Sequence, residues 1–314
     1  MRSVEASYIW PRFDLKEERP LPGVKILDWT IYWFMFPLAI GVTTAASLCG
    51  IGGPALFTPI FIILLPLLGP EYLLQSAVAA FGAALLTQCF GFTSAFFGYY
   101  RRRVIDFKTA IPFAAVGVPF GIIGALLTQA VDDNLLKAGY GILMLVLAAV
   151  MLRRPNGNGN DSNEMNVETV ERRRIIDRDG TDYEYPRPRQ GIGAIVTGAG
   201  ALLTGMVSVG IGEVMMPQLI KRHRIPIPVA AGTSVMVAIL VVIACSVTLT
   251  MGLIAKGGMT AVPWNLVCYT IPGVIIGGQI GPRLQGQFDQ AAMVKFIGTL
   301  FIAISAAMLW VVFA

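Results

Sequence analysis

The stretch GIGGPALFTP at residues 50–59 decides the fold, because it interrupts a run of apolar residues long enough to be buried in a membrane. A related stretch, SVGIGEVMMP at residues 208–217, interrupts a second apolar run, and aligning the final prolines places Gly52 opposite Gly210. Unwound backbone inside a bilayer persists only where it is buried in protein or lines a polar cavity. Two breaks in matching places therefore predict a transport site. The alternative is that the glycines only allow close helix packing.

The composition indicates an all-α polytopic membrane protein. Hydrophobic residues make up 55% of the 314 residues and charged residues only 14%, and the mean hydropathy is +0.67, which is far too apolar for an ordinary soluble chain. Lys and Arg outnumber Asp and Glu by 24 to 19, but the excess lies in connecting loops. The basic residues therefore indicate which loops lie on the cytoplasmic side. We expect the lipid bilayer to be a partner and expect no nucleic acid to bind.

The chain divides into two homologous halves. We expect an N-terminal extension (residues 1–29), a first transmembrane repeat (30–153), a hydrophilic linker (154–190) and a second repeat (191–314). A second marker supports the duplication, because VPFGIIG at residues 118–124 aligns with IPGVIIG at residues 271–277. Each half is predicted to contain a broken helix pair and three transmembrane helices. The predicted helices are 30–48, 55–68, 73–100, 107–128, 135–152, 192–207, 213–220, 228–253, 262–280 and 291–313.

The segments that follow the two breaks, residues 55–68 and 213–220, are too short for both to cross a membrane that needs about 20 residues. Each break is therefore predicted to be the tip of a re-entrant helical hairpin. Arg101, Arg102, Arg103, the linker, the KRHR loop and Arg283 then share one face, which we expect to be cytoplasmic. The halves become inverted repeats with both termini outside. In the alternative topology the short segments continue the crossing and both termini lie inside.

The linker contains a possible small β-hairpin about Asp179-Gly180, within RRIIDRDGTDYEY. The acids there, Asp177, Asp179 and Asp182, do not have the spacing of an EF-hand calcium loop. We expect a solvated loop, with no metal site and no cofactor.

The chain resembles the sulfite exporter TauE/SafE family, also called TSUP. The likeness rests on GIGGPALFTP, the arginine cluster before Ile105-Asp106, VPFGIIG, GIGEVMMP and AAGTSV at residues 230–235. It implies a secondary transporter of small sulfur-containing anions, such as sulfite, sulfoacetate or thiosulfate, in the inner membrane. Pro54 and Ile211 stand where the family commonly has glycine, which bears on substrate identity more than on fold.

The first break offers backbone groups to such an anion. A helix that begins at Pro54 has N–H groups and a dipole that favour a negative charge, and proline is suited to the first helical turn. Gly50, Gly52 and Gly53 would let a ligand approach the backbone. This predicts anion binding without a buried lysine.

The second break contributes Gly210, Gly212 and Glu213, and Glu213 is the acid in an apolar setting. Ionisable residues inside a membrane are candidates for function, so Glu213 is a candidate for proton coupling. The alternative is that it caps a helix start. Thr233 and Ser234, together with Gln88 and Gln279, are candidate donors to the oxygens of the anion. Each of these side chains is also of the kind that bonds one helix to another.

The sequence argues against an enzyme, because it contains no GxSxG or HExxH motif and its single histidine lies in a basic loop. No catalytic residue is predicted. An anion channel, which could also use helix N-termini for selectivity, and a membrane assembly protein without transport activity are the alternatives. Assembly as a homo-oligomer is left open.

Overall fold

The computed structural model describes residues 30–49, 53–152, 172–187, 191–222, 224–284 and 290–313. The described part is almost entirely helical. The elements of the first half are α1 (Met35–Cys49), α2 (Pro54–Pro59), η1 (Ile60–Leu64), α3 (Leu65–Leu68), η2 (Pro70–Tyr72), α4 (Ala77–Arg101), α5 (Phe107–Thr128) and α6 (Asp133–Leu152). Those of the second half are α7 (Gly191–Val207), α8 (Ile211–Pro217), η4 (Gln218–Arg222), α9 (Ile227–Gly257), η5 (Met259–Ala261), α10 (Trp264–Leu284) and α11 (Gln290–Phe313).

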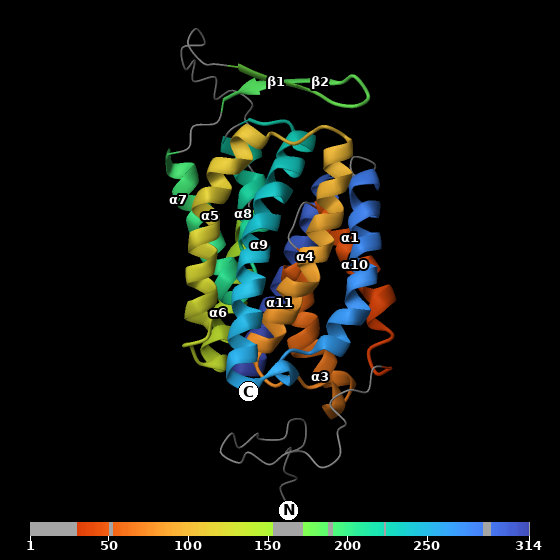
Figure 1. Cartoon of the computed structure of the whole chain (residues 1–314), viewed down its shortest axis with the longest axis vertical. Coiled ribbons are helices and arrows are strands. Elements are labelled where there is room, and N and C mark those ends of the chain that lie inside the picture. Colours follow the sequence, from red (N-terminus) through yellow and green to blue (C-terminus); the bar gives the residue numbers. More distant parts are fainter. Residues whose placement is uncertain are drawn as a thin grey trace, which may run out of the picture.

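Between the halves, β1 (Arg172–Ile176) and β2 (Asp182–Pro186) form an antiparallel β-hairpin. Its turn contains Gly180 at φ 83°, a conformation that favours glycine. The β-hairpin expected about Asp179-Gly180 is therefore confirmed. Figure 1 shows it lying across one end of the helix bundle, which we call the hairpin end.

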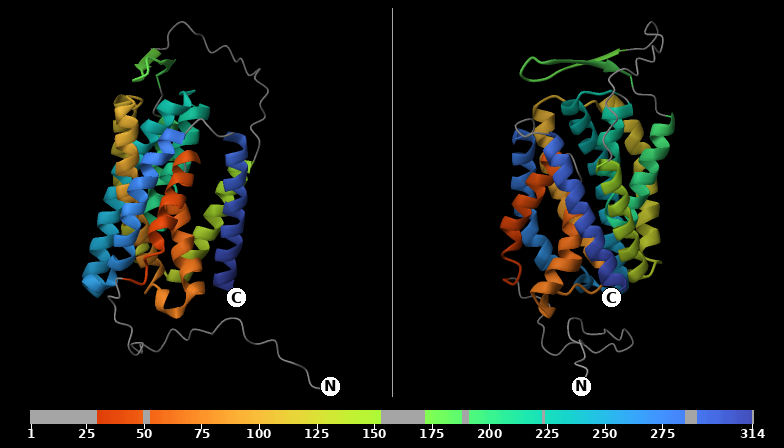
Figure 2. Two further views of the ribbon diagram at one scale, coloured as in Figure 1. Left: turned by 90° about the vertical axis from the view of Figure 1, so that its right-hand side faces the viewer. Right: turned by 180° about the vertical axis from the view of Figure 1, so that it is seen from behind.

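The helices alternate in direction between the two ends of the bundle (Figures 1 and 2). In the first half, α1 starts at the end opposite the β-hairpin, and α2 to α3 run back toward that same end. In the second half, α7 starts at the hairpin end and α8 with η4 return to it. The last helix, α11, finishes at the opposite end, where the C-terminus is marked.

The two breaks are followed by the same succession of elements. The short helix α2 finishes at Pro59 and α8 finishes at Pro217, and each is followed by a five-residue π-helical turn. Proline lacks the N–H that would continue an α-helical ladder, and a widened turn is one way in which a helix accommodates this loss. The prolines aligned in the sequence thus occupy equivalent structural positions.

Each half packs its helices against the other half in a matched way. Helix α1 packs on α10 and α7 packs on α5, while α4 and α9 contact each other and α6 contacts α11. Glycines make the first two contacts close. A Cβ added to Gly124 would lie 2.1 Å from the carbonyl oxygen of Leu202, and one added to Gly277 would lie 2.8 Å from that of Ile40. Gly124 and Gly277 are the pair aligned by the second sequence marker.

The outside of the bundle is apolar. Within the described residues, five helices are long and apolar enough to cross a membrane, namely Ala77–Arg101, Phe107–Thr128, Asp133–Leu152, Ile227–Gly257 and Lys295–Phe313. Large side chains such as Ile195, Phe296 and Trp310 are exposed on the surface, where a soluble protein rarely gathers so much apolar area. The protein is a multi-pass α-helical membrane protein.

The predicted helices match the structure closely, with two informative differences at their ends. Helix α4 begins at Ala77 rather than at Leu73, because the Ser76 hydroxyl accepts a hydrogen bond from the N–H of Ala79 and caps the helix. Helix α9 continues past Leu253 to Gly257 and ends where Gly258 adopts φ 72°.

Candidate functional site

The short helix α2 lies next to the second break inside the bundle. The hydroxyls of Thr58 in α2 and Ser208 at the second break form a buried hydrogen bond of 2.6 Å. From α6, the Tyr140 hydroxyl donates to the carbonyl oxygen of Ala55 at 2.7 Å. Tyr140 also lies within electrostatic range of Glu213 in α8. The buried Tyr140 hydroxyl is therefore bonded to the start of α2 and interacts electrostatically with an acid of α8.

The second break is fixed by hydrogen bonds to its own backbone. Gly210 has φ 147°, and a Cβ there would lie 2.4 Å from the carbonyl oxygen of Gly200, so a larger residue does not fit. The N–H of Ile211 donates to the Thr204 hydroxyl at 2.7 Å. The N–H of Gly210 donates to Glu213 Oε2 at 3.0 Å. The Glu213 carboxylate thus caps α8, which is the structural alternative considered for it.

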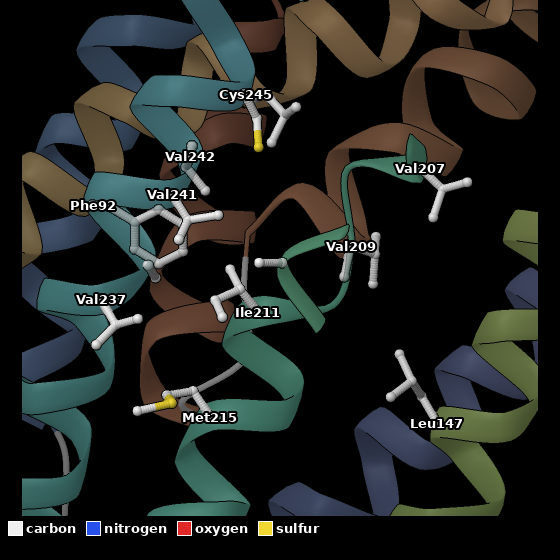
Figure 3. Close-up of a cluster of buried hydrophobic side chains, with 14 of the residues drawn as sticks. Phe92, Leu147, Val207, Val209, Ile211, Met215, Val237, Val241, Val242 and Cys245 are labelled. Atoms are coloured by element: carbon white, nitrogen blue, oxygen red, sulfur yellow. The ribbon is translucent and has the colours of Figure 1, made fainter. Parts of the chain in front are cut away.

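Apolar side chains surround the second break (Figure 3). Figure 3 shows Ile211 and Met215 of α8 pointing toward the side chains of α9, with Phe92 of α4 beside them. The labelled members from α7, the break itself, α8 and α9 are Val207, Val209, Ile211, Met215, Val237, Val241, Val242 and Cys245. This packing leaves Gly210, Gly212 and Glu213 outside the polar cavity described next.

That cavity lies between α1, α4 and α9, beside the first break. The cavity volume that the centre of a water molecule can occupy is about 30 Å³. This is enough for about two waters. Its lining consists of small, hydroxyl, amide and aromatic side chains, and no charged residue is among the lining residues described. They are Thr43, Ala46, Ser47, Gln88, Gly91, Phe92, Ala95, Tyr99, Ala231, Ser234 and Val235.

Two of the lining groups are buried polar atoms without a partner in the described part of the chain. They are the Gln88 amide nitrogen Nε2 and the Thr43 hydroxyl, on side chains that are 2% and 3% exposed. Most buried donors in proteins are hydrogen-bonded, so these two mark a place where a ligand or water completes the bonding. The Gln88 amide also reaches the first break, because a Cβ on Gly53 would lie 1.9 Å from Nε2.

The structure brings together part of the predicted site. Gln88 and Ser234 line the cavity, Gly53 adjoins it through Gln88, and Pro54 begins α2 next to Gly53. The Ser234 hydroxyl donates to the carbonyl oxygen of Ala231, so its hydrogen is already engaged. Gly50 and Gly52 lie outside the described residues.

Thr233 and Gln279 lie away from the cavity. The Thr233 hydroxyl accepts a hydrogen bond from the N–H of Asp106 at 3.0 Å. Gln279 Nε2 donates to the Ser94 carbonyl at 2.6 Å and to its hydroxyl at 3.0 Å. Both side chains join one helix to another here, and their role as substrate donors stays a prediction.

Sequence reasoning missed Thr43, Ser47 and Tyr140. Thr43 and Ser47 are four residues apart on α1, so they share one helix face. That spacing is a usable signal, although hydroxyls in apolar helices usually bond their own backbone. Tyr140 lies on α6, far from either break in sequence, and nothing local indicates its contact with Ala55.

A bundle of lipid-exposed helices enclosing two helix breaks and a polar cavity is the arrangement of a membrane transporter. The chain belongs to the sulfite exporter TauE/SafE family, whose model matches residues 35–308. It is 23% identical over 270 residues to the probable membrane transporter protein YunE of Bacillus subtilis, covering 85% of this chain and 93% of that protein. It is 24% identical over 271 residues to a probable membrane transporter protein of Xylella fastidiosa, covering 85% and 90%. No solved structure is significantly similar to it.

Proposed function

We propose that the protein is a secondary transporter of small sulfur-containing anions, of the class of sulfite, sulfoacetate and thiosulfate, in the cytoplasmic (inner) membrane. The observation that carries the proposal is the pair of unpartnered buried donors, Gln88 Nε2 and Thr43 Oγ1, in a cavity beside the start of α2. Donors without acceptors suit an oxyanion, whose oxygens only accept hydrogen bonds. The family's name supports sulfite as the representative substrate.

Neutral donors also suit a substrate that must leave again. A hydrogen bond to a charged group contributes about 1.5–3 kcal/mol, so a few of them hold an anion without trapping it as a buried lysine or arginine would. The N-terminus of the segment that starts at Pro54 adds a favourable dipole. The volume of about 30 Å³ favours the smallest members of the class.

We infer further that the halves are inverted repeats, each with a re-entrant helical hairpin. Three observations support this: the opposite starting ends of α1 and α7 (Figures 1 and 2), the matched contacts of α1 with α10 and of α7 with α5, and the equivalent turns after Pro59 and Pro217. A helix of 15 residues such as α1 is about 22 Å long, shorter than a hydrocarbon core of about 30 Å. The contact between Thr58 and Ser208 would then lie near the midplane.

Proton coupling at Glu213 is part of the proposal. Its carboxylate caps α8 and stands in electrostatic range of the Tyr140 hydroxyl, which is bonded to the start of α2. Protonation of Glu213 would weaken the cap of one break and alter the charge felt by a residue that contacts the other. This is a route by which a proton could bias the arrangement of both breaks.

The test is uptake of sulfite, thiosulfate, sulfoacetate, sulfate and taurine into liposomes that contain the purified protein. We expect saturable uptake of at least one sulfur oxyanion. In Gln88→Leu, loss of a donor to the anion should weaken the apparent affinity about tenfold or more. Gly53→Ala should act in the same direction, because its Cβ displaces the Gln88 amide.

The matched control is Gln218→Leu, the same change at a buried glutamine of η4 whose Nε2 donates to the carbonyl oxygen of Gly193. It should leave the affinity of folded protein within about twofold, since it does not line the cavity. Unaltered affinity in both Gln88→Leu and Gly53→Ala would remove this cavity from the transport path. Conductance that does not saturate would favour a channel instead.

A further inference from the structure

A second cavity lies at the hairpin end, between the β-hairpin and the first turns of α5. Its volume of about 330 Å³ is at the lower end of the range for ligand pockets. Three of its lining side chains are cationic, and no acid is among the described residues that line it. The lining residues are Lys108, Thr109, Ile111, Pro112, Phe113, Arg173 and Arg187.

The positive charge comes from two elements that are distant in sequence. Lys108 belongs to α5, whereas Arg173 lies on β1 and Arg187 follows β2. The neighbouring carboxylate of Asp106 accepts two hydrogen bonds from Arg173, at 2.7 and 3.0 Å. Cationic side chains from both elements thus meet at the cavity with no acid among its described lining residues, which favours an anion with more than one oxygen acceptor.

The cavity also borders the membrane. Helix α5 is one of the candidate spans, and Lys108 is its second residue. Ile111, which lines the cavity, is 57% exposed, and its neighbour Phe107 is 38% exposed. Apolar side chains that face lipid directly beside clustered cations are the combination that an anionic lipid headgroup and its acyl chain would contact.

We propose that this cavity binds a phosphate-bearing anion, with an anionic phospholipid as the source that its apolar edge favours. The phosphate would be held by Lys108 from the bundle and by Arg173 and Arg187 from the β-hairpin. Occupancy therefore strengthens the attachment of the β-hairpin to α5. The site is distinct from the cavity beside the first break, so it does not depend on the proposed substrate.

The test measures the melting temperature of the purified full-length protein in neutral detergent during titration with three probes. These are dioctanoyl phosphatidylglycerol, dioctanoyl phosphatidylcholine and inorganic phosphate. We expect a saturable rise with phosphatidylglycerol and none with phosphatidylcholine. The variant Lys108→Gln/Arg187→Gln should need about tenfold more phosphatidylglycerol for half of the effect, as the loss of two basic contacts implies.

The matched control is Arg172→Gln/Arg174→Gln, which also removes two positive charges from this end. Both arginines are largely exposed and pair with Glu184 and Asp182 rather than lining the cavity. This control should respond like the unmodified protein. If the double variant does not fold, Lys108→Gln alone serves as the test, since Lys108 lies outside the Arg173–Asp106 ion pair.

A saturable response to inorganic phosphate that matches phosphatidylglycerol would identify free phosphate as the source. The site chemistry proposed here would then still hold. An equal response of both double variants would overturn the proposal. So would the absence of any saturable response to either anionic probe in the unmodified protein.

Discussion

The carboxylate of Glu213 accepts a backbone hydrogen bond and also interacts electrostatically with the buried Tyr140. Its Oε2 accepts from the N–H of Gly210 at 3.0 Å, and Tyr140 lies in electrostatic range. A capping role and a titrating role are therefore compatible in the same residue. They differ in what happens when the charge is removed and the shape is kept.

Glu213→Gln separates these roles, because the amide oxygen can still accept the bond from Gly210 but the side chain no longer titrates. If Glu213 couples transport to protons, accumulation driven by a pH gradient is lost while anion exchange without a gradient persists. We expect this outcome, measured in proteoliposomes. The control Glu71→Gln, at an exposed acid of η2, should alter neither activity.

Gradient-driven accumulation that survives in well-folded Glu213→Gln protein would leave the residue as a cap only. In that case the change should cost about 1 kcal/mol of stability or less.

The polar residues of the site were predictable from sequence to the extent that their type is unusual in an apolar helix. Gln88 and Glu213 are unusual in this sense, and the structure places both next to a helix break or within one. Thr43 was not predictable, since a threonine in a helix normally bonds the carbonyl four residues earlier. Only the tertiary arrangement, in which α1, α4 and α9 all line the cavity, shows that its hydroxyl is unpaired there.

Among the elements, the β-hairpin has a specific attachment to the bundle. The carboxylate of Asp106 caps α5 through the N–H of Thr109 and accepts hydrogen bonds from Arg173 and from the Tyr185 hydroxyl. Burial alone would raise the pKa of Asp106, but the hydrogen bonds from these three residues outweigh it. The pKa of Asp106 therefore lies below its ordinary value.

Asp106→Asn should loosen the β-hairpin. The variant loses charge-assisted hydrogen bonds worth about 2 kcal/mol, so we expect faster amide hydrogen exchange in residues 172–187. Because the pKa of Asp106 is lowered in the folded protein, its contribution is present above the ordinary value of 3.8 and is lost as the pH falls through the lowered pKa. Exchange in the unmodified protein should rise in that acidic window, whereas Asp106→Asn lacks this dependence.

The control for this prediction is Asp182→Asn, which breaks the ion pair between Asp182 and Arg174. The Arg174 side chain is 66% exposed and the Asp182 side chain is 42% exposed. Exposed pairs contribute less than about 1 kcal/mol, so exchange should change little. Equal exchange rates in Asp106→Asn and in the unmodified protein would show that other contacts hold the β-hairpin.

The elements were largely predictable because apolar periodicity and glycine or proline punctuation are local signals. The β-hairpin followed from Asp179-Gly180 in the same way. The π-helical turns after Pro59 and Pro217 were not predicted, since a proline signals a disturbed helix without specifying how the backbone adjusts. The attachment through Asp106 depends on contacts between segments some 67 to 79 residues apart.

At the scale of the whole molecule, charge is distributed unequally between the two ends of the bundle. The hairpin end carries the arginine cluster at the end of α4 and the arginines of the β-hairpin. It also carries Arg222 at the end of η4 and Arg283 near the end of α10 (Figure 1). The hairpin end also carries acids, such as Asp182 and Glu184, but the described part of the opposite end has far fewer basic residues, among them Lys137 and Lys256. Short loops rich in lysine and arginine remain in the cytoplasm. The hairpin end is therefore expected to be cytoplasmic.

This orientation can be tested with protease sites inserted at the two ends. A site at Gly157, which lies in the linker outside the described residues, should be cut only from the cytoplasmic face. A site at Gly258, in the exposed connection after α9, should be cut only from the other face. Cleavage at Gly157 in right-side-out vesicles would overturn the assignment of the linker to the cytoplasm. Cleavage of both sites from the same face would contradict either the re-entrant course of α7 and α8 or the passage of α9 through the membrane. In both cases it would overturn the inverted arrangement of the two halves.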